Sequence, residues 1–377
     1  MNNQIGLVLS GGGAKGAYHV GVMQAIKELG LSIGMISGAS IGALNGAVLA
    51  SAPSLDIGTE RLTELWWSLT KENPIEPNEL KEFIQVASKT WGLGTYIKLL
   101  TSAGLQLNPL ALALILMFGV HETPTLCSDR VLRKQMAKYL DMERLQQSIP
   151  LYVSVFPQKT HNSLGDVAIG IKDLIQTTLF SQENCLSEFR HIQSLSLDDQ
   201  KEMILASAAL PLLFQARKQN GIRYTDGGQG GMVKSQGNTP ITPLIDAGCR
   251  HVIVVHLDGG SLWHRYDHGD DISIVEIRPS IDMGGFFAML DFSEETVAKL
   301  IKTGYQDAMH ALGRVQSALS AVYAARHQTQ LMMQAITSYD SNQTQLDHTS
   351  EARSPTTKYE GRQKLDNAMA ELAKMFE

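Results

Sequence analysis

The sequence predicts an α/β fold: a mainly parallel central sheet with helices on both faces, a helical insertion and a helical C-terminal tail. Two short apolar runs, residues 5–9 and 33–36, are each followed by a glycine cluster and then by a helix-like stretch. This β–α–β–α order favours a parallel sheet. A later run, residues 251–257, is nearly all apolar, which is typical of a strand covered on both faces. Residues 151–155 and 273–277 are further predicted strands.

Length and composition are those of a soluble globular protein with a large core. The chain has 377 residues, of which 44% are hydrophobic, and a formal charge of −6. It contains no block of basic residues, so no nucleic-acid polymer is expected as a partner. Its cysteines, Cys127, Cys185 and Cys249, are odd in number and widely spaced, which favours a reducing compartment over a disulfide framework. The N-terminus leads almost directly into the first strand, so we expect no signal peptide and a cytoplasmic protein.

A candidate nucleophile, Ser40, lies between the second predicted strand and the helix that follows. Gly38 and Gly42 flank it in a G-x-S-x-G pattern. A sharp strand-to-helix turn exposes such a serine, and glycines on both sides remove steric collisions there. The helix N-terminus beside Ser40 favours negative charge. The pattern alone is weak, and the strand–turn–helix setting gives it weight.

A second glycine cluster, residues 11–16, follows the first predicted strand. Gly11, Gly12 and Gly13 expose backbone N–H groups that no side chain shields, and such groups at a helix N-terminus bind anions. We predict that they form an oxyanion hole, in which one donor is worth about 3–4 kcal/mol of barrier. Lys15 either adds positive charge beside this loop or is a solvated residue of the first helical turn.

The sequence argues against two kinds of nucleotide-binding site at the same cluster. A Walker A loop would have Lys and then Ser or Thr after its last glycine, but Gly16 is followed by Ala17. A dinucleotide-binding fingerprint would have an acidic residue about twenty positions further on. That position is occupied by residues 37–40, which contain no acid.

The predicted base is a carboxylate rather than a histidine. None of the 11 histidines has a distinctive setting; His19, His251 and His256 fit surface or core positions. Asp226 ends a short β-like run and opens a glycine turn. The carboxyl end of a strand is where open α/β sheets build their sites, although an ordinary Asp-Gly turn would have the same sequence.

Together these motifs resemble the patatin-like phospholipase family. The glycine cluster 11–16, the serine pattern 38–42 and the Asp226-Gly227-Gly228 turn occur in the family's order. Residues 206–214 resemble its segment before the aspartate strand, and residues 238–241 resemble its Asn-x-Pro segment. The resemblance covers roughly residues 4 to 310.

The resemblance implies an α/β core with a Ser–Asp dyad, no metal and no cofactor. Ser40 would be the nucleophile that forms an acyl-enzyme, and Asp226 the base that activates water to clear it. Gly11, Gly12 and Gly13 would form the oxyanion hole, and Gly16, Gly38, Gly42, Gly227 and Gly228 would complete the motifs. The substrate class would be acyl esters of membrane phospholipids, which implies peripheral contact at the inner membrane.

Two segments depart from a plain core. Residues 229–237 lengthen the connection between Asp226 and the Asn-x-Pro segment, and this glycine-rich loop is expected beside the dyad. Residues 71–125 form an insertion with an apolar run at 109–120, too short to span a bilayer. The insertion is either a buried helix or a lid over Ser40.

The domain prediction is a catalytic domain over residues 1–310 and a helical extension over residues 311–377. Val315, Leu319 and Val322 have helical spacing. Residues 339–358 are polar and are expected to form a loop or a disordered segment.

Three hypotheses of function follow. The first is a cytoplasmic serine lipid acyl hydrolase. The second is the same phospholipase gated by a cyclic nucleotide as an antiphage signalling effector, with residues 71–125 and the added loop as places where the activator would bind. The third is a non-catalytic binding module on the same fold. Head group, acyl position and oligomeric state are left open.

Overall fold

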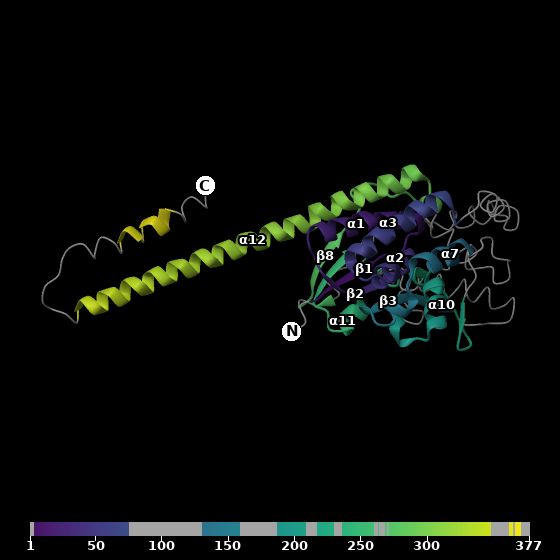
Figure 1. Ribbon diagram of the computed structural model, residues 1–377, viewed down its shortest axis with the longest axis horizontal. Helices are drawn as coiled ribbons and strands as arrows, with labels where there is room; N and C mark the ends of the chain where they lie inside the picture. Colours follow the sequence, from purple (N-terminus) through teal and green to yellow (C-terminus); the bar gives the residue numbers. More distant parts are fainter. Residues whose placement is uncertain are drawn as a thin grey trace, which may run out of the picture. The chain divides into compact units, whose positions relative to one another are not determined.

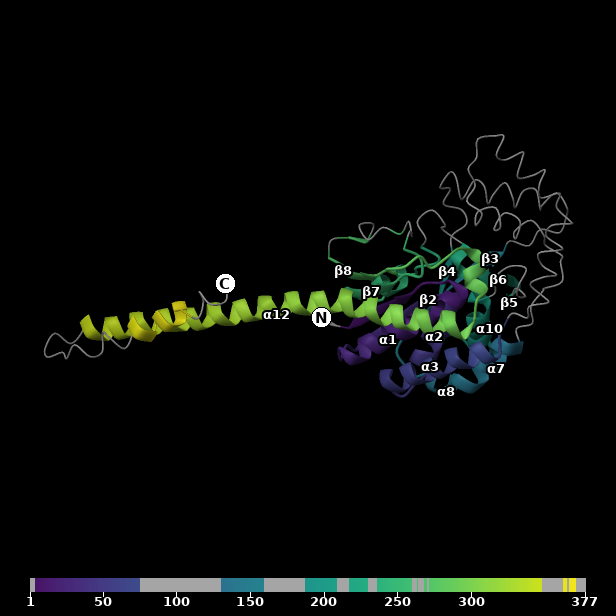
Figure 2. The same cartoon turned by 90° about the horizontal axis from the view of Figure 1, so that it is seen from above.

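A computed structural model gives the arrangement of the elements, seen in Figure 1 and turned by 90° in Figure 2. It describes residues 4–74, 130–158, 187–208, 217–229, 236–259, 263, 268–269, 271–347, 362–364 and 366–370. The chain divides into two compact units, Met1–Ala311 and Leu312–Glu377. The predicted insertion lies outside the described residues from residue 75 onwards, and so does its apolar run at 109–120.

The first unit alternates strands and helices at its start, as the sequence predicts. Its strands are β1 (Ile5–Leu9), β2 (Ile33–Ala39), β3 (Leu151–Gln158), β4 (Glu188–His191), β5 (Arg217–Gln219), β6 (Ile222–Asp226), β7 (His251–Val255) and β8 (Ser273–Ile277). Its helices are α1 (Ala17–Glu28), α2 (Ile41–Ala50), α3 (Leu55–Lys71), α7 (Arg130–Tyr139), α8 (Met142–Leu145), α10 (Leu197–Ser207) and α11 (Thr242–Asp246), followed by the start of α12 (Glu294–Asp347).

The strands form one sheet in the order β5-β6-β3-β2-β1-β7-β8, with β4 also paired to β3. The run from β3 through β2, β1 and β7 to β8 is parallel, whereas β4, β5 and β6 pair antiparallel. The prediction of a mainly parallel sheet is therefore confirmed. The antiparallel strands at one edge of the sheet matter for the site, because one of them, β6, ends at Asp226.

Helices cover both faces of this sheet, as predicted. On one face α2 approaches so closely that a Cβ on Gly46 would lie within 4 Å of Leu9 and Ile36. On the other face Val8 packs in one buried cluster with Ile241 and Leu244 at α11. Neighbouring residues of a strand point to opposite faces, so β1 contributes to both layers of the core.

The first turns of α12 pack against α1 through two glycines. A Cβ on Gly21 would lie 1.9 Å from the Ile301 carbonyl oxygen, and one on Gly304 would lie 2.1 Å from that of Tyr18. The Tyr18 hydroxyl also donates to Asp307 at 2.9 Å. Only glycine allows backbones to approach this closely, so the two positions fix the contact of the helices.

The predicted polar loop at 339–358 is wrong over its first part. Helix α12 continues through residues 339–347, and the remainder of the predicted loop lies outside the described residues. Polar residues such as Ser, Asn and Thr have only modestly lower helix propensity than Ala. Once a long helix exists, each added residue gains a hydrogen bond without a new nucleation step, so composition alone placed the helix end too early.

Candidate active site

Ser40 lies at the turn between β2 and α2, in a conformation that few non-glycine residues adopt. Its φ is 52° and its ψ −125°, and among the described residues only Asn220 is another non-glycine with positive φ. Such backbone strain costs about 1–3 kcal/mol and is concentrated at functional sites. The Ser40 side chain does not cap α2, and the residue is only 5% exposed. The hydroxyl is therefore not used to stabilise the helix.

The glycines around Ser40 are required by space. A Cβ on Gly42 would lie 2.1 Å from the carbonyl oxygen of Leu9 in β1, and one on Gly38 would lie 2.4 Å from that of Gly42. Both obstacles are backbone atoms, which cannot rotate away. The G-x-S-x-G spacing thus lets the start of α2 lie directly on the end of β1.

We expect Gly42→Ala to destabilise the fold by about 1–3 kcal/mol, because the added methyl group overpacks against the β1 backbone. Gly313→Ala is the matched control, since Gly313 is also helical but a Cβ there meets nothing within 4 Å. The control should gain up to about 1 kcal/mol from better helix propensity. Urea unfolding measures both changes, and equal stability of the two variants would contradict the packing argument.

Strand register brings Asp226 to the end of β2. Ala39, the last residue of β2, pairs with Ser154 of β3, and Asp226, the last residue of β6, pairs with the next β3 residue, Val155. The turn after Asp226 is also tight, since a Cβ on Gly227 would lie 2.2 Å from the Ser154 carbonyl oxygen. Two strand ends far apart in sequence therefore lie level with each other on either side of β3.

Asp226 is buried, and one of its carboxylate oxygens has no hydrogen-bond partner. Oδ1 accepts from the Gly228 N–H at 2.8 Å, whereas Oδ2 is buried without a partner. Burial raises the pKa of Asp226 to about 6, and the Ser40 hydroxyl and the Gly228 N–H partly oppose this rise. The Ser40 hydroxyl thus lies close enough to the Asp226 carboxylate to lower its pKa as a hydrogen-bonding side chain.

A serine that the motifs did not identify as functional holds the backbone of Ser40. The Ser40 N–H donates to Ser207 Oγ at 2.9 Å, and Ser207 Oγ donates to the Ser154 carbonyl oxygen at 2.6 Å. The strained turn is thereby tied to β3 at the residue that pairs with the end of β2. Ser207 lies in the segment 206–214 that resembles the family, but nothing in its spacing indicated this contact.

The glycine loop differs from its prediction at Gly11. The Gly11 N–H donates to Asn238, to Oδ1 at 3.1 Å and to the carbonyl oxygen at 3.3 Å, so it is not free to bind an oxyanion. Within the described part of the chain, the N–H groups of Gly12 and Gly13 donate no hydrogen bond. Gly13 has φ 57°, and a Cβ there would lie 2.3 Å from the Met289 carbonyl oxygen, so this position also needs glycine.

Lys15 is not a solvated residue. It is 8% exposed, its ammonium group donates to the Gly284 carbonyl oxygen at 2.6 Å, and burial lowers its pKa, an effect that Asp258 and Asp282 partly oppose. Of the two predictions for Lys15, a positive charge beside the glycine loop is the one that fits this burial.

The three histidines named above, His19, His251 and His256, lie in settings unlike that of a catalytic base. His19 is fully buried against Asn45, and burial lowers its pKa to about 3. His256 is buried and pairs with Glu276 at 3.1 Å. His251 is exposed at the start of β7. Among the described residues no histidine hydrogen-bonds to the Ser40 side chain.

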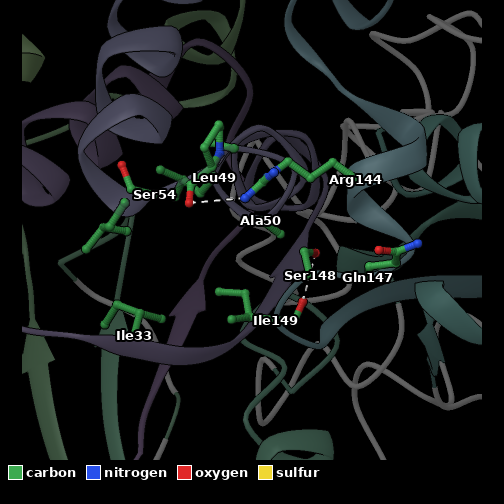
Figure 3. A pocket seen from close by; sticks show the side chains of 11 residues that line it. Ile33, Leu49, Ala50, Ser54, Arg144, Gln147, Ser148 and Ile149 are labelled. Carbon is green, nitrogen blue, oxygen red and sulfur yellow. Dashed lines mark hydrogen bonds between the residues drawn. The ribbon is translucent and has the colours of Figure 1, made fainter.

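A cavity of about 390 Å³ lies at the other end of α2 and β2 (Figure 3). It is lined by Ile33 at the start of β2, by Leu49 and Ala50 at the end of α2, and by Arg144, which donates to the Pro53 carbonyl oxygen. Neither Ser40 nor Asp226 lines it, so it is separate from the site described above.

In the described ranges, no group of three His, Cys, Asp or Glu side chains could hold a metal ion. None of the helices described is both long and apolar enough to cross a membrane.

The chain is 48% identical over 69 residues to neuropathy target esterase sws of Drosophila persimilis and 46% identical over 69 residues to that of Drosophila melanogaster. These matches cover 18% of this chain, which spans about 5% of the length of these relatives.

Solved structures with a similar arrangement include VipD from Legionella pneumophila and the ExoU–SpcU complex of the Pseudomonas aeruginosa type III secretion system. VipD has a TM-score of 0.40 at 16% identity, covering 83% of this chain and 67% of that chain. The ExoU–SpcU structure has a TM-score of 0.31 at 16% identity, covering 97% and 66%. At these TM-scores the likeness carries no further argument.

The family model described as patatin-like phospholipase matches residues 7–245, which is more than half of the 377 residues. This range begins in β1, contains Ser40 and Asp226, and ends in α11. The chain belongs to the patatin-like phospholipase family, a family of lipid acyl hydrolases.

Proposed function

We propose that this protein hydrolyses acyl esters of membrane phospholipids with Ser40 as nucleophile and Asp226 as base. One observation carries the proposal: Asp226, at the end of β6, has a buried carboxylate oxygen without a partner. It lies near Ser40, whose backbone is strained and whose side chain does not cap α2. An oriented and desolvated carboxylate can accept a serine proton without a histidine. The family match supplies the substrate class.

In the first step Ser40 Oγ attacks the ester carbonyl carbon while its proton passes to Asp226 Oδ2. The tetrahedral intermediate then collapses, the bond to the leaving alcohol breaks, and Asp226 returns the proton to that alcohol. The acyl group remains on Ser40 as an ester.

In the second step Asp226 Oδ2 takes a proton from water, which attacks the acyl-enzyme. The fatty acid leaves and the proton returns to Ser40 Oγ, so the enzyme is regenerated without a cofactor. We assign the oxyanion to the N–H groups of Gly12 and Gly13, since the Gly11 N–H is used by Asn238. The positive N-terminal end of α2 favours the same charge.

A vesicle assay tests the proposal. Vesicles of mixed phospholipids are incubated with the full chain, and released fatty acids and lysolipids are identified by mass spectrometry. A fluorophosphonate probe is applied in parallel, and the labelled residue is located by peptide mapping. Release of fatty acid together with a label on Ser40 supports the proposal. A chain that neither cleaves esters nor takes the label would be the non-catalytic binding module instead.

The form gated by a cyclic nucleotide stays a prediction from sequence. The segments where an activator was predicted to act, residues 71–125 and 229–237, lie for the most part outside the described residues. The same vesicle assay, repeated with cyclic nucleotides, distinguishes the gated enzyme from a constitutive one.

A further inference from the structure

Asn238 joins the glycine loop through a reciprocal pair of hydrogen bonds. Its Oδ1 accepts from the Gly11 N–H at 3.1 Å, and its Nδ2 donates to the Gly11 carbonyl oxygen at 3.3 Å. Both contacts agree on the orientation of the side-chain amide, since only this orientation satisfies the Gly11 donor and acceptor together. The loop has little room to shift, because a Cβ on Gly11 would lie 2.9 Å from Ser40 Cβ.

The same side chain lies beside the base. A Cβ placed on Gly228 would be 3.0 Å from Asn238 Oδ1 and also 3.0 Å from Asp226 Oδ1. Since both oxygens lie that close to one point, they are no more than about 6 Å apart. Asn238 therefore lies between the glycine loop and the carboxylate of Asp226.

The neighbouring residues extend this arrangement into a clamp. Thr239 Oγ1 hydrogen-bonds to Ser10 Oγ at 3.0 Å, and the Pro240 carbonyl oxygen accepts from Ser37 Oγ. Ser10 follows β1 and Ser37 lies within β2, so residues 238–240 span the ends of both strands that lead into the site.

We propose that Asn238 is a positioning residue: it holds Gly11 so that Gly12 and Gly13 face the oxyanion, and it does so without placing a charge beside Asp226. This rests on the proposed function and adds a residue to it. The requirement for a neutral side chain follows from the distance. A second carboxylate within about 6 Å of Asp226 would oppose its ionisation, and Asp226 must be ionised to accept the serine proton.

Charged groups on the surrounding elements are engaged elsewhere. Lys15 of the glycine loop donates to Gly284 and interacts with Asp258 and Asp282. On β4, Arg190 pairs with Glu188 and donates to the Tyr224 hydroxyl. On α10, Glu202 pairs with Arg133. The pKa of Asp226 is set by burial and by the contacts with Ser40 and Gly228, with no charged side chain among its causes.

The decisive variant is Asn238→Asp, measured by the pH profile of kcat/KM on a short soluble ester. Aspartate keeps the size and the acceptor for the Gly11 N–H but adds a negative charge. Two charges no more than about 6 Å apart in a partly buried site interact strongly enough to raise the apparent pKa of the acid limb by about 1–2 pH units. The parent limb is expected near pH 6, as the pKa of Asp226 indicates. A limb that does not move would overturn the inference.

Asn238→Ala tests the positioning of the loop, with Thr59→Val as the control. Alanine removes both contacts with Gly11 and is expected to lower kcat about 10- to 100-fold with little change in KM, because donors that bind only the transition state are displaced. Thr59→Val removes a buried hydrogen bond in α3, which contributes no residue to the site, and should lose stability but keep kcat and the pH profile. Equal loss of kcat in both variants would mean that general loosening, not positioning, is responsible.

Different results would contradict the proposed function and the inference about Asn238. A parent that neither hydrolyses esters nor takes a fluorophosphonate on Ser40 would end the proposed function and this inference with it. A parent with an acid limb near pH 6, together with an Asn238→Asp variant of the same profile, would end this inference alone.

Discussion

Ser40→Ala is expected to lower ester hydrolysis by about 10⁴-fold or more, because in the proposed mechanism the acyl-enzyme forms on Ser40. The variant should fold normally. Alanine keeps the Cβ and tolerates the same backbone, and the Ser40 N–H still reaches Ser207. Turnover on vesicles and on a soluble ester measures the loss, and the fluorophosphonate label should disappear at the same time.

Ser51→Ala is the control for this variant. Ser51 is fully buried at the far end of α2, and its hydroxyl donates to the Val48 carbonyl oxygen at 3.2 Å. Its loss should cost about 1 kcal/mol of stability and leave turnover unchanged. Retention of more than a tenth of parental activity in Ser40→Ala would mean that another residue is the nucleophile.

Patterns within single segments were enough to predict the parallel sheet and the turn around Ser40. The apolar run at 251–257 and the repeated strand–glycine–helix order led to a parallel sheet, since each signal lies within one segment. The turn around Ser40 was predictable for the same reason, because the close contact of Gly38 with Gly42 lies within one turn, whereas the contact of Gly42 with Leu9 of β1 joins two separate segments. The G-x-S-x-G spacing predicted the type of turn, but it could not predict which distant segments contact that turn.

The rest of the site depends on register between distant strands. Asp226 meets Ser40 because β2 and β6 both pair with β3 at adjacent residues, about 70 positions from Asp226 along the chain. The bonds of Ser207 and Asn238 to the turn and to the glycine loop are likewise long-range. The resemblance to a family indicated the segments that contain Ser207 and Asn238. Only the three-dimensional structure shows that the Gly11 N–H donates to Asn238 and that Lys15 is buried.

Asp226→Asn is expected to lower kcat about 10²–10⁴-fold, because the amide cannot accept the serine proton. The acid limb of the parent pH profile should vanish with it. In the parent, activity rises with pH as Asp226 ionises, with a midpoint near its pKa of about 6. Full turnover in the variant would show that a different group acts as base. Fluorophosphonate labelling of Ser40, slowed but not abolished, would show that the nucleophile is still in place.

The same variant should be more stable than the parent at high pH. The pKa of Asp226 is raised from 3.8 to about 6 in the folded state, so the folded protein binds this proton more tightly than the unfolded chain. Stability from this group is therefore fully present below about pH 4 and is lost as pH rises through 6. The shift of roughly two pKa units corresponds to about 3 kcal/mol, which the uncharged amide does not lose.

Urea unfolding of parent and Asp226→Asn at pH 4 and pH 8 checks this sign. The gap between the variants should be larger at pH 8 than at pH 4 and in favour of asparagine at pH 8. A gap of the opposite sign would mean that ionised Asp226 stabilises the fold, which would conflict with a buried oxygen that has no partner. If the expected sign is found together with the loss of turnover, the desolvation that makes Asp226 a base also lowers the stability of the folded enzyme.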